Sequence, residues 1–586
     1  MYVLGIACHY HDASATLLKD GCIVAAALEE RFTRKKHDTA FPENAIRYCL
    51  QSQGISASDL TAVAFYEKPF LKFERVLFQH MQMFPWSLKT FVSAMPAWLS
   101  EKLRLMRTIR KVLKYHGEVF FVEHHLSHAA SAFLLSPFRN ATIVTVDGVG
   151  EWSTTTYGIG RDAEILLLKD IRFPHSLGLL YSTMTAYLGF SVNNAEYKVM
   201  GLSAYGNQDR QRNRYCALLR KVIDSKADGS YHLDLQYFTF HFKDRMPSEK
   251  LCALLGDQPR KPNSPITQRH KDIAAALQMV LEEVLTKILH HAYAQTKCPT
   301  LVMAGGVALN SVWNGKILQK TPFKRVWIQP DAGDGGSSMG AAAYVYHTIL
   351  GQKRTFPLEH AYLGPAFSTD DVRTFLDSHK IQYRELENER HLIETAAQLI
   401  AKNQIVGWFQ GAMEWGPRAL GARSILSNPM NPHMQHILNQ KVKHRERFRP
   451  FAPSVCAEDA STYFECDKPL PLPTHFMLMV YPIKKRWRTR IPAVTHVDGS
   501  GRLQAVQKTS NPRFYALIKR YGQLTGIPML INTSFNVRGE PIVCTPFDAY
   551  RCMMGTGIDY LLIDRFLIRR ADNLRDAWNS ESTAMD

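Results

Sequence analysis

Residues 122–155 constrain the fold of this chain more than any other stretch. The segment VEHHLSHAASAF predicts a helix from about His124, so that His124 and His128, four residues apart, present their imidazoles on one face. The apolar residues 141–146 predict a buried strand that ends at once in Asp147-Gly148. An acidic residue at such a strand end lies where open α/β sheets bind ligands. The stretch therefore predicts an α/β fold with a polar site at this strand end.

Two imidazoles and a carboxylate suit Fe²⁺, Mn²⁺ or Zn²⁺ better than Mg²⁺ or Ca²⁺. A second strand–loop–helix unit, RVWIQ followed by PDAGDGGSSMGAAAY, offers Asp331 or Asp334 as a further ligand, and Gly335 in the same loop admits a nucleotide. The alternative is that one histidine caps the helix and the other is a packed core residue. The two acidic loops together favour the metal site.

Glycines at a third strand end indicate a nucleotide. The strand PTLVMAGG leads into Gly305, Gly306 and Asn310 at the start of a helix, where a phosphate or a flat ring can approach the backbone. Lys198, ahead of another glycine-punctuated turn, is a candidate to meet a phosphate or carboxylate.

Residues 2–31 predict two strands joined by a polar turn that carries His9, His11, Asp12 and Ser14. This arrangement opens many actin-like ATPase folds, although an ordinary hairpin has the same pattern. The charged segment 29–38 that comes next is either a solvated loop or the lining of a polar substrate cleft. In the second interpretation the residues that line the cleft are Glu29, Arg31, Lys36 and His37.

Length and composition bound the architecture. With 586 residues, two or more domains are expected, and 46% apolar with 21% charged residues is typical of a globular protein. Residues 271–295 predict an amphipathic helix, and another is expected at 370–379. Residues 70–116, rich in Phe, Met and Trp, predict packed helices of an inserted cap, interrupted at Pro85 and Pro96, in preference to a membrane-surface patch. Ten isolated cysteines and no bilayer-length apolar run indicate a cytoplasmic protein.

The formal charge of +18 indicates either nucleic acid or pockets for small anions. Beyond residue 370, polar and basic side chains gather at several predicted strand ends, which favours a pocket for polyanions. The clusters are Arg418 with Arg423; Lys441, Lys443, Arg447 and Arg449; His496, Asp498 and Arg502; and Asn532, Thr533, Ser534, Asn536 and Arg538.

Ordered blocks along the chain resemble the O-carbamoyltransferases of antibiotic and nodulation-factor biosynthesis, typified by the tobramycin and cephalosporin carbamoyltransferases. The blocks are GIACHYHDASATLLKDG, EERFTRKKHD, HHLSHAAS, KVMGLSAYG, GGVALN, MEWGPRALGARSIL, KHRERFRPFAPSV, THVDG and NTSFNVRGEPIV. The resemblance implies an N-terminal actin-like ATPase (Kae1-like) domain at 1–355, a linker at 356–370, a C-terminal YrdC/Sua5-like α/β domain at 371–575, and a tail at 576–586.

The resemblance also implies roles. The C-terminal domain makes carbamoyl adenylate from carbamoyl phosphate and Mg-ATP, and the N-terminal domain moves the carbamoyl group to a hydroxyl of a small-molecule natural product. Fe²⁺ is the favoured metal, and the GDGG context favours Asp334 over Asp331. The implied residues are His124, His128, Asp147 and Asp334 for the metal; Gly305, Gly306 and Asn310 for adenosine; and Arg418, Lys443, Arg449 and Arg502, with Ser534 and Asn536 nearby, for carbamoyl phosphate and triphosphate.

An acceptor hydroxyl needs a base, and His11 is the candidate, with His9 and Asp12 as neighbours. The expected partner is the small-molecule acceptor, with no nucleic acid, no membrane and a possible homodimer. The alternatives are a carbamoylation enzyme directed at tRNA or protein and an actin-like nucleotide-binding protein without transferase chemistry.

Overall fold

The structure is a computed structural model that describes residues 1–354, 358–446 and 448–580. The chain forms two compact units: unit 1 contains residues 1–26 and 39–358, and unit 2 contains residues 27–38 and 359–586. The segment 27–38 was predicted as part of the first domain, but its contacts place it in unit 2. Arg447, part of the predicted linker and most of the predicted tail lie outside the described residues.

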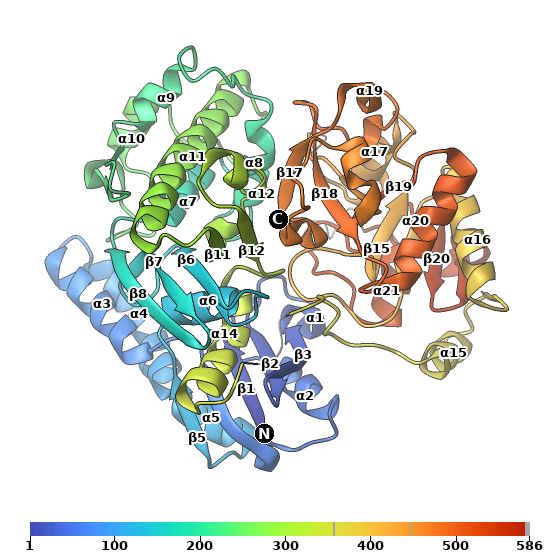
Figure 1. The fold of residues 1–586 in the computed structure, drawn as a ribbon, viewed down its shortest axis with the longest axis horizontal. Coiled ribbons are helices and arrows are strands. Elements are labelled where there is room, and N and C mark those ends of the chain that lie inside the picture. Colours follow the sequence, from blue (N-terminus) through green and yellow to red (C-terminus); the bar gives the residue numbers. More distant parts are fainter. Residues whose placement is uncertain (355–357, 447, 581–586) are drawn as a thin grey trace. The chain divides into compact units, whose positions relative to one another are not determined.

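Unit 1 contains two five-stranded sheets with the same topology (Figure 1). In the first, β1 (Tyr2–Ala7) is antiparallel to β2 (Ser14–Lys19) and parallel to β4 (Leu60–Phe65), which is parallel to β5 (Glu118–Phe121). β3 (Cys22–Leu28) lies at the other edge, beyond β2. The segment expected to be only a turn between two strands therefore contains a strand, β2.

The second sheet repeats this plan. β6 (Asn140–Val146) is antiparallel to β7 (Ser153–Arg161), which is antiparallel to β8 (Glu164–Arg172). On its other side β6 is parallel to β11 (Thr300–Ala304), and β11 is parallel to β12 (Arg325–Ile328). A central strand with an antiparallel meander on one side and two parallel strands on the other, present twice, is the topology of the actin-like fold. The predicted α/β class and actin-like N-terminal domain are confirmed.

Two helices lie between these sheets. α6 (His124–Phe133) packs on β6 and β11, α14 (Ser337–Tyr344) packs on β1 and β2, and the two helices pack against each other. Gly340 permits this close approach, because a Cβ there would lie 1.9 Å from the backbone oxygen of Ser127. On the other side, a Cβ at Gly5 would lie 2.0 Å from the backbone oxygen of Ser338. Because neither glycine has a side chain, α14 can pack closely between β1 and α6.

Further helices complete unit 1. α7 (Leu177–Tyr187), α8 (Glu196–Ser203), α9 (Arg214–Leu219) and α10 (Glu249–Leu255) precede the long helix α11 (Gln268–Thr296), which was predicted at 271–295. α3 (Pro69–Gln82), α4 (Leu88–Ser100) and α5 (Leu105–Leu113) form the expected helical insertion. Pro96 lies inside α4 and does not interrupt it.

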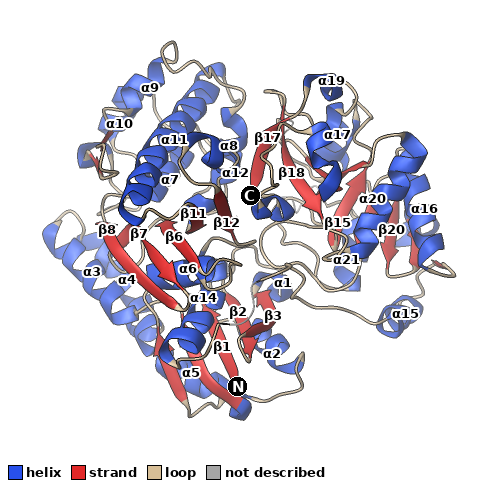
Figure 2. Ribbon diagram, in the orientation of Figure 1, coloured by secondary structure: helices blue, strands red, loops and turns tan. Residues whose placement is uncertain are grey.

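Unit 2 is built on one nine-stranded mixed sheet (Figure 2), so its predicted α/β class is confirmed. The sheet includes β14 (Val406–Phe409), β15 (Arg423–Ser427), β16 (Ala452–Cys456), β18 (Ser500–Val506) and β19 (Met529–Ser534). Helices α16 (Glu389–Ala401) and α20 (Pro512–Thr525) pack with Trp408 and Leu530 in its core. The helix expected at 370–379 is α15 (Thr369–Ser378).

None of the described cysteines forms a disulfide. Over the same residues, no helix combines the length and the apolar character that crossing a bilayer requires.

Candidate functional site

Four side chains of unit 1 converge on one point. One ligand atom from each of His124, His128, Asp147 and Asp334 lies within 4.8 Å of the others, and all four residues are buried. The Nε2 atoms of the two histidines are 3.1 Å apart. His124 Nε2 lies 3.1 Å from Asp147 Oδ2, and His128 Nε2 lies 3.4 Å from Asp334 Oδ1. Asp331, the alternative fourth ligand in the sequence, does not belong to this group.

Each ligand is held by a backbone feature. The Glu151 carboxylate accepts the backbone N–H of His124 at 3.0 Å and so ties down the first turn of α6. Asp147 follows β6, and its Oδ1 accepts the N–H of Gly306 at 2.8 Å. Asp334 begins the 3-10 turn η5 (Asp334–Gly336) that leads into α14. The close packing of α6 and α14 then brings Asp334 to the histidines.

The donor set fits a divalent first-row metal. Ligand atoms about 2.1 Å from an ion, at tetrahedral or octahedral angles, lie about 3.0–3.5 Å from each other. The observed separations of 3.1–3.9 Å are close to this range. Both carboxylate oxygens of Asp334 are buried and accept no hydrogen bond from any described residue. Because a buried carboxylate that accepts no hydrogen bond is costly, a cation at this point would stabilise Asp334.

The four groups are strongly coupled through their charges. Burial disfavours the charged imidazole, but the carboxylates of Asp334 and Asp147 outweigh it and raise the pKa of His124 to about 9. Burial likewise opposes ionisation of Asp147, yet the neighbouring His124 and His128 hold the pKa of Asp147 well below its ordinary value. Without a cation, a proton on His124 offsets part of the carboxylate charge, and a metal has to displace that proton.

His11 lies at the edge of this cluster. Its Nδ1 is 2.8 Å from Asp12 Oδ2, and its Nε2 is 3.8 Å from Asp334 Oδ2. Burial opposes protonation, but Asp334 and Asp12 raise the pKa of His11 to about 10. The Tyr10 ring lies 4.6 Å from that of His11, and burial, with the charges of Asp334 and Asp147, raises the pKa of Tyr10.

His9, the third residue predicted in this turn, is in a different environment. Burial lowers the pKa of its ring, and the nearest charges acting on it are those of Lys102, Glu67, Glu101 and Lys72. Of the predicted catalytic trio, only His11 and Asp12 are grouped with Asp334.

The predicted adenosine residues lie beside the four-ligand cluster. Gly305 has φ +93°, and a Cβ there would lie 2.2 Å from the carbonyl oxygen of Val146. The side chains of Asn310 and Gln278 exchange two hydrogen bonds of 3.1 and 3.0 Å, and Gln278 also donates to Glu282 at 3.2 Å. Gln278 and Glu282 were not singled out in the sequence, because both are ordinary polar residues within a helix pattern.

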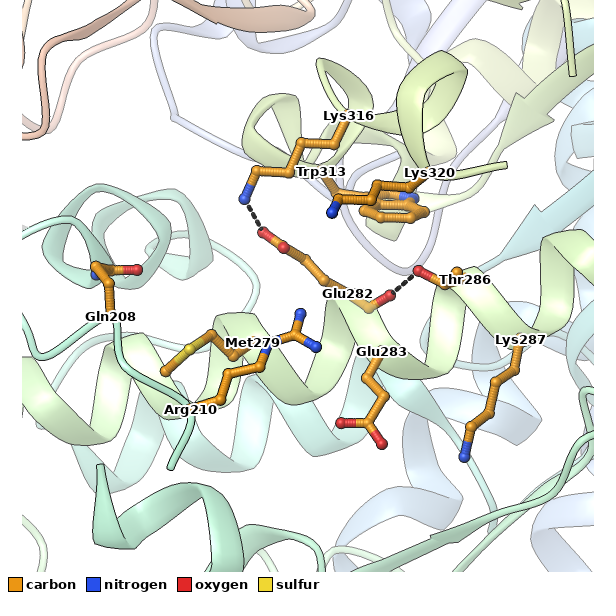
Figure 3. A pocket seen from close by; sticks show the side chains of 10 residues that line it. All are labelled: Gln208, Arg210, Met279, Glu282, Glu283, Thr286, Lys287, Trp313, Lys316 and Lys320. Atoms are coloured by element: carbon orange, nitrogen blue, oxygen red, sulfur yellow. Dashed lines mark hydrogen bonds and ion pairs between the residues drawn. The ribbon is translucent and has the colours of Figure 1, made fainter. Parts of the chain in front are cut away.

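A cavity of about 610 Å³ adjoins this network (Figure 3). Glu282 belongs both to this network and to the lining of the cavity. Its carboxylate accepts a hydrogen bond from Gln278 and forms an ion pair with Lys316 at 2.7 Å. Gly305, Gly306 and Asn310 do not line the cavity. Its lining residues are Gln208, Arg210, Met279, Glu282, Glu283, Thr286, Lys287, Trp313, Lys316 and Lys320.

Two further predicted residues of unit 1 have structural contacts. The backbone oxygen of Gly335 accepts a hydrogen bond from the hydroxyl of Ser14 at 2.7 Å, which links the start of β2 to the loop that carries Asp334. Lys198 is buried on α8, with its Nζ 5.7 Å from the Phe190 ring centroid.

Unit 2 contains a second site candidate, a group of basic side chains. Burial and then the positive charges of Arg418, Arg445 and Arg449 hold the pKa of Arg502 well below its ordinary range. The structure therefore brings together Arg418, Arg449 and Arg502 from separate predicted clusters. Arg445 belongs with them but was not singled out in the run KHRERFRPF.

Lys443 lies close by, among oxygen acceptors. Its Nζ donates to Asn536 Oδ1 at 2.8 Å and to the Asn536 backbone oxygen at 2.9 Å, and it also contacts the backbone oxygen of Ser534. Burial, with the charges of Arg445 and Arg449, lowers the pKa of Lys443 well below its ordinary value. The structure thus places Lys443, Ser534 and Asn536 together.

The carboxylate of Glu414 holds the turn that contains Arg418. Glu414 Oε1 accepts the backbone N–H groups of Leu420, Ala422 and Arg423 at 2.7–3.1 Å. Arg423 itself is fully buried and donates to the carbonyl oxygens of Gln410, Gly411 and Pro365. The prediction that Arg423 belongs to a polyanion pocket together with Arg418 is therefore wrong, because its guanidinium donates to carbonyl oxygens and holds the loop.

The charged segment 27–38 is anchored within unit 2. Arg31 donates to the carbonyl oxygen of Gly416 at 2.9 Å, and Arg34, which was not singled out in the sequence, donates to those of Ile542 and Pro541 at 2.8 Å each. Glu29 is buried, and the backbone N–H of His37 donates to Glu30 at 2.8 Å. The predicted role of Glu29, Arg31, Lys36 and His37 in substrate binding stays a prediction.

Comparison with known proteins identifies the family. The family model "Carbamoyltransferase N-terminus" matches residues 2–343, and "Carbamoyltransferase C-terminus" matches residues 397–570. An uncharacterized protein of Synechocystis is 44% identical, with 97% of each chain covered. Nodulation protein NolNO of Sinorhizobium fredii is 35% identical over 97% of this chain and 80% of its own. Nodulation protein NolO of Bradyrhizobium diazoefficiens is 34% identical over 79% of this chain and 82% of its own. With both family models matched in order, the chain belongs to the carbamoyltransferase family and is a carbamoyltransferase.

Proposed function

We propose that the protein is an ATP-dependent O-carbamoyltransferase that acts on a hydroxyl of a small-molecule natural product. Carbamoyl phosphate, ATP and water give carbamoyl adenylate, phosphate and pyrophosphate. The acceptor oxygen then forms a bond to the carbamoyl carbon, AMP leaves, and the hydroxyl proton passes to a base. The nodulation relatives are in keeping with a small-molecule acceptor.

The observation that carries the first step is the convergence of Arg418, Arg445, Arg449 and Arg502 in unit 2. Glu446 lies 3.5 Å from Arg449 and offsets part of this charge. The excess of positive charge in a partly buried place still favours the binding of a polyanion. Guanidinium groups also bind phosphate oxygens in a bidentate manner. Lys443, held by Ser534 and Asn536, adds a further cation for a triphosphate or carbamoyl phosphate.

The second step is assigned to unit 1. His124, His128, Asp147 and Asp334 would hold the metal, with Fe²⁺ favoured and Mn²⁺ or Zn²⁺ as alternatives. When bound, the ion supplies Lewis acidity toward phosphate or carbonyl oxygen. Gly305, Gly306 and Asn310 are the proposed contacts of adenosine. Gly305 lets the loop approach Val146 closely, Gly306 donates to Asp147, and the Asn310–Gln278–Glu282 network offers hydrogen bonds to adenosine.

His11 is the proposed base. Its Nδ1 is oriented by Asp12, which leaves Nε2 to take the acceptor proton. The charges of Asp334 and Asp12 keep this imidazole protonated near neutral pH, so it becomes a base only when a cation offsets the charge of Asp334.

Pyrophosphate release tests the proposal most directly. With carbamoyl phosphate and ATP together, and no acceptor, we expect pyrophosphate and a carbamoyl-AMP mass; with either substrate alone, neither should form. Pyrophosphate from ATP alone would contradict it. For the tRNA-directed alternative, RNA binding that weakens steeply with salt is the distinguishing result.

A further inference from the structure

The helical insertion of unit 1 exposes an unusual amount of apolar side chain. Among the described residues, 19 large hydrophobic side chains are exposed, and ten of them fall within residues 70–99. The sequence predicted that these residues are packed inside a cap. The ten, here called the insertion patch, are Phe70, Leu71, Leu77, Phe78, Met81, Phe84, Trp86, Leu88, Val92 and Leu99.

The insertion patch follows the outward faces of two paired helices. On α3, Phe70, Phe78 and Met81 recur at helical spacing, whereas Lys72, Arg75 and His80 are buried on the inner face. α4 packs against α3 through Trp98, whose ring lies 5.6 Å from that of Phe73. Figure 1 shows α3 and α4 side by side at the margin of unit 1. The helices are therefore fixed from within, while their outer side chains meet solvent.

The loop between α3 and α4 carries two of the most exposed side chains of the patch. Phe84 is 66% exposed and Trp86 is 71% exposed, values comparable with the 71% of Phe70 at the start of α3. Aromatic side chains of this kind favour the boundary between water and lipid, where the ring is buried among headgroups.

Basic residues accompany the patch. Residues 68–114 contain ten Lys and Arg but only two acidic residues, Glu74 and Glu101. Two of the ten, Lys72 and Arg75, are buried, and Lys68 pairs with Glu123. On α5, Leu105, Ile109 and Leu113 are buried, while Arg107, Arg110 and Lys111 are exposed. An exposed apolar patch followed by a basic helix matches the chemistry of an anionic lipid surface, which takes apolar side chains and attracts cations at once.

We propose that the insertion patch docks on the surface of a bilayer that contains anionic lipids. A second copy of this chain fits less well. A two-fold interface brings the same patch of both copies together, so that basic residues would face basic residues. The proposal goes beyond the carbamoyl-transfer function and replaces the expectation that no membrane is involved. It concerns surface binding, for which no membrane-crossing helix is needed.

Vesicle flotation with the full chain tests it, using phosphatidylcholine vesicles with or without phosphatidylglycerol. The wild type should float with the phosphatidylglycerol vesicles. The double variant Phe84→Ser/Trp86→Ser should bind them at least about tenfold more weakly, since two large apolar side chains no longer enter the lipid. The matched control Leu524→Ser/Leu574→Ser changes two exposed apolar residues of unit 2 and should float as the wild type does.

Two further measurements make the outcome unambiguous. Arg107→Glu/Lys111→Glu should remove the preference for phosphatidylglycerol. Brominated lipid should quench the tryptophan fluorescence of the wild type more than that of Trp86→Phe. Equal vesicle binding by wild type and Phe84→Ser/Trp86→Ser, with both folded by circular dichroism, would overturn the proposal. So would a wild type that binds no vesicles and is a dimer in light scattering, if the same double variant is a monomer.

Discussion

The Nε2 atoms of His124 and His128 lie 3.1 Å apart at the centre of unit 1. Two imidazole nitrogens that face each other at this distance need a proton or a cation between them, since two lone pairs repel. With Asp147 and Asp334 completing the group, one divalent ion satisfies all four side chains together.

Replacing His128 should weaken metal binding. We expect His128→Ala to bind a divalent first-row metal at least about a hundredfold more weakly, because one of four candidate ligands is lost and no described neighbour replaces it. Metal content after dialysis, measured by elemental analysis, checks this. The control is His125→Asn on the same helix: His125 Nδ1 bonds Thr145 at 2.7 Å, so this variant should keep its metal. Equal metal content in both variants would contradict the assignment.

Removing one arginine of the unit 2 cluster should slow adenylate formation. Arg502→Gln is expected to lower the rate of pyrophosphate release by about a hundredfold, because a charge-assisted contact to the polyanion disappears. Lys485→Gln, a change of an exposed basic residue in the same unit, is the control and should leave the rate unchanged. Arg502→Gln with the wild-type rate would remove this cluster from the reaction.

Filling the contact between α6 and α14 should disturb the metal site from a distance. In Gly340→Ala the new methyl group meets backbone atoms at 1.9 Å, so we expect a loss of at least about 1–3 kcal/mol in unfolding free energy and weaker metal binding. Gly333→Ala, in the loop just before Asp334, meets nothing closer than 3.6 Å. Chemical denaturation should therefore separate the two variants clearly; a stable Gly340→Ala would show that the helices can move apart.

The free energy of unfolding should fall in mild acid because His241 is buried in its neutral form. Burial lowers the pKa of this side chain to about 4, whereas an unfolded histidine titrates near 6.5. As the pH drops from about 6.5 to 4, the unfolded chain takes up a proton that the folded chain does not, so folding loses of the order of 2–3 kcal/mol. His241→Phe should remove this part of the acid dependence in denaturation curves.

The sequence was most informative where a local pattern decides the structure. The i, i+4 spacing of His124 and His128 and the strand end at Asp147 were sufficient to place three ligands together. The choice between Asp331 and Asp334 was not readable from spacing, because it depends on how α14 packs on α6. The prediction for Arg423 was wrong for the same reason. The sequence around a basic residue beside a turn is the same whether its guanidinium binds a ligand or donates to carbonyl oxygens.

Long-range contacts were beyond the sequence. The partnership of Asn310 with Gln278 joins residues 32 apart, and neither side chain is distinctive alone. The exposure of Phe84 and Trp86 was equally hidden, since helical periodicity of apolar residues predicts a buried face and cannot tell when that face lacks a protein partner.

Segment 27–38 makes unit 2 discontinuous, since these twelve residues are separated from the rest of it by some 320 residues of unit 1. Arg31 donates to the carbonyl oxygen of residue 416, and Arg34 donates to those of residues 541 and 542. The segment therefore supplies hydrogen bonds that hold loops of unit 2 in place. During synthesis, the ribosome delivers this segment long before the sheet that receives it. A gene cut near residue 358 would therefore divide unit 2: the N-terminal fragment would contain all of unit 1 together with this segment, and the C-terminal fragment would lack the segment that completes its unit.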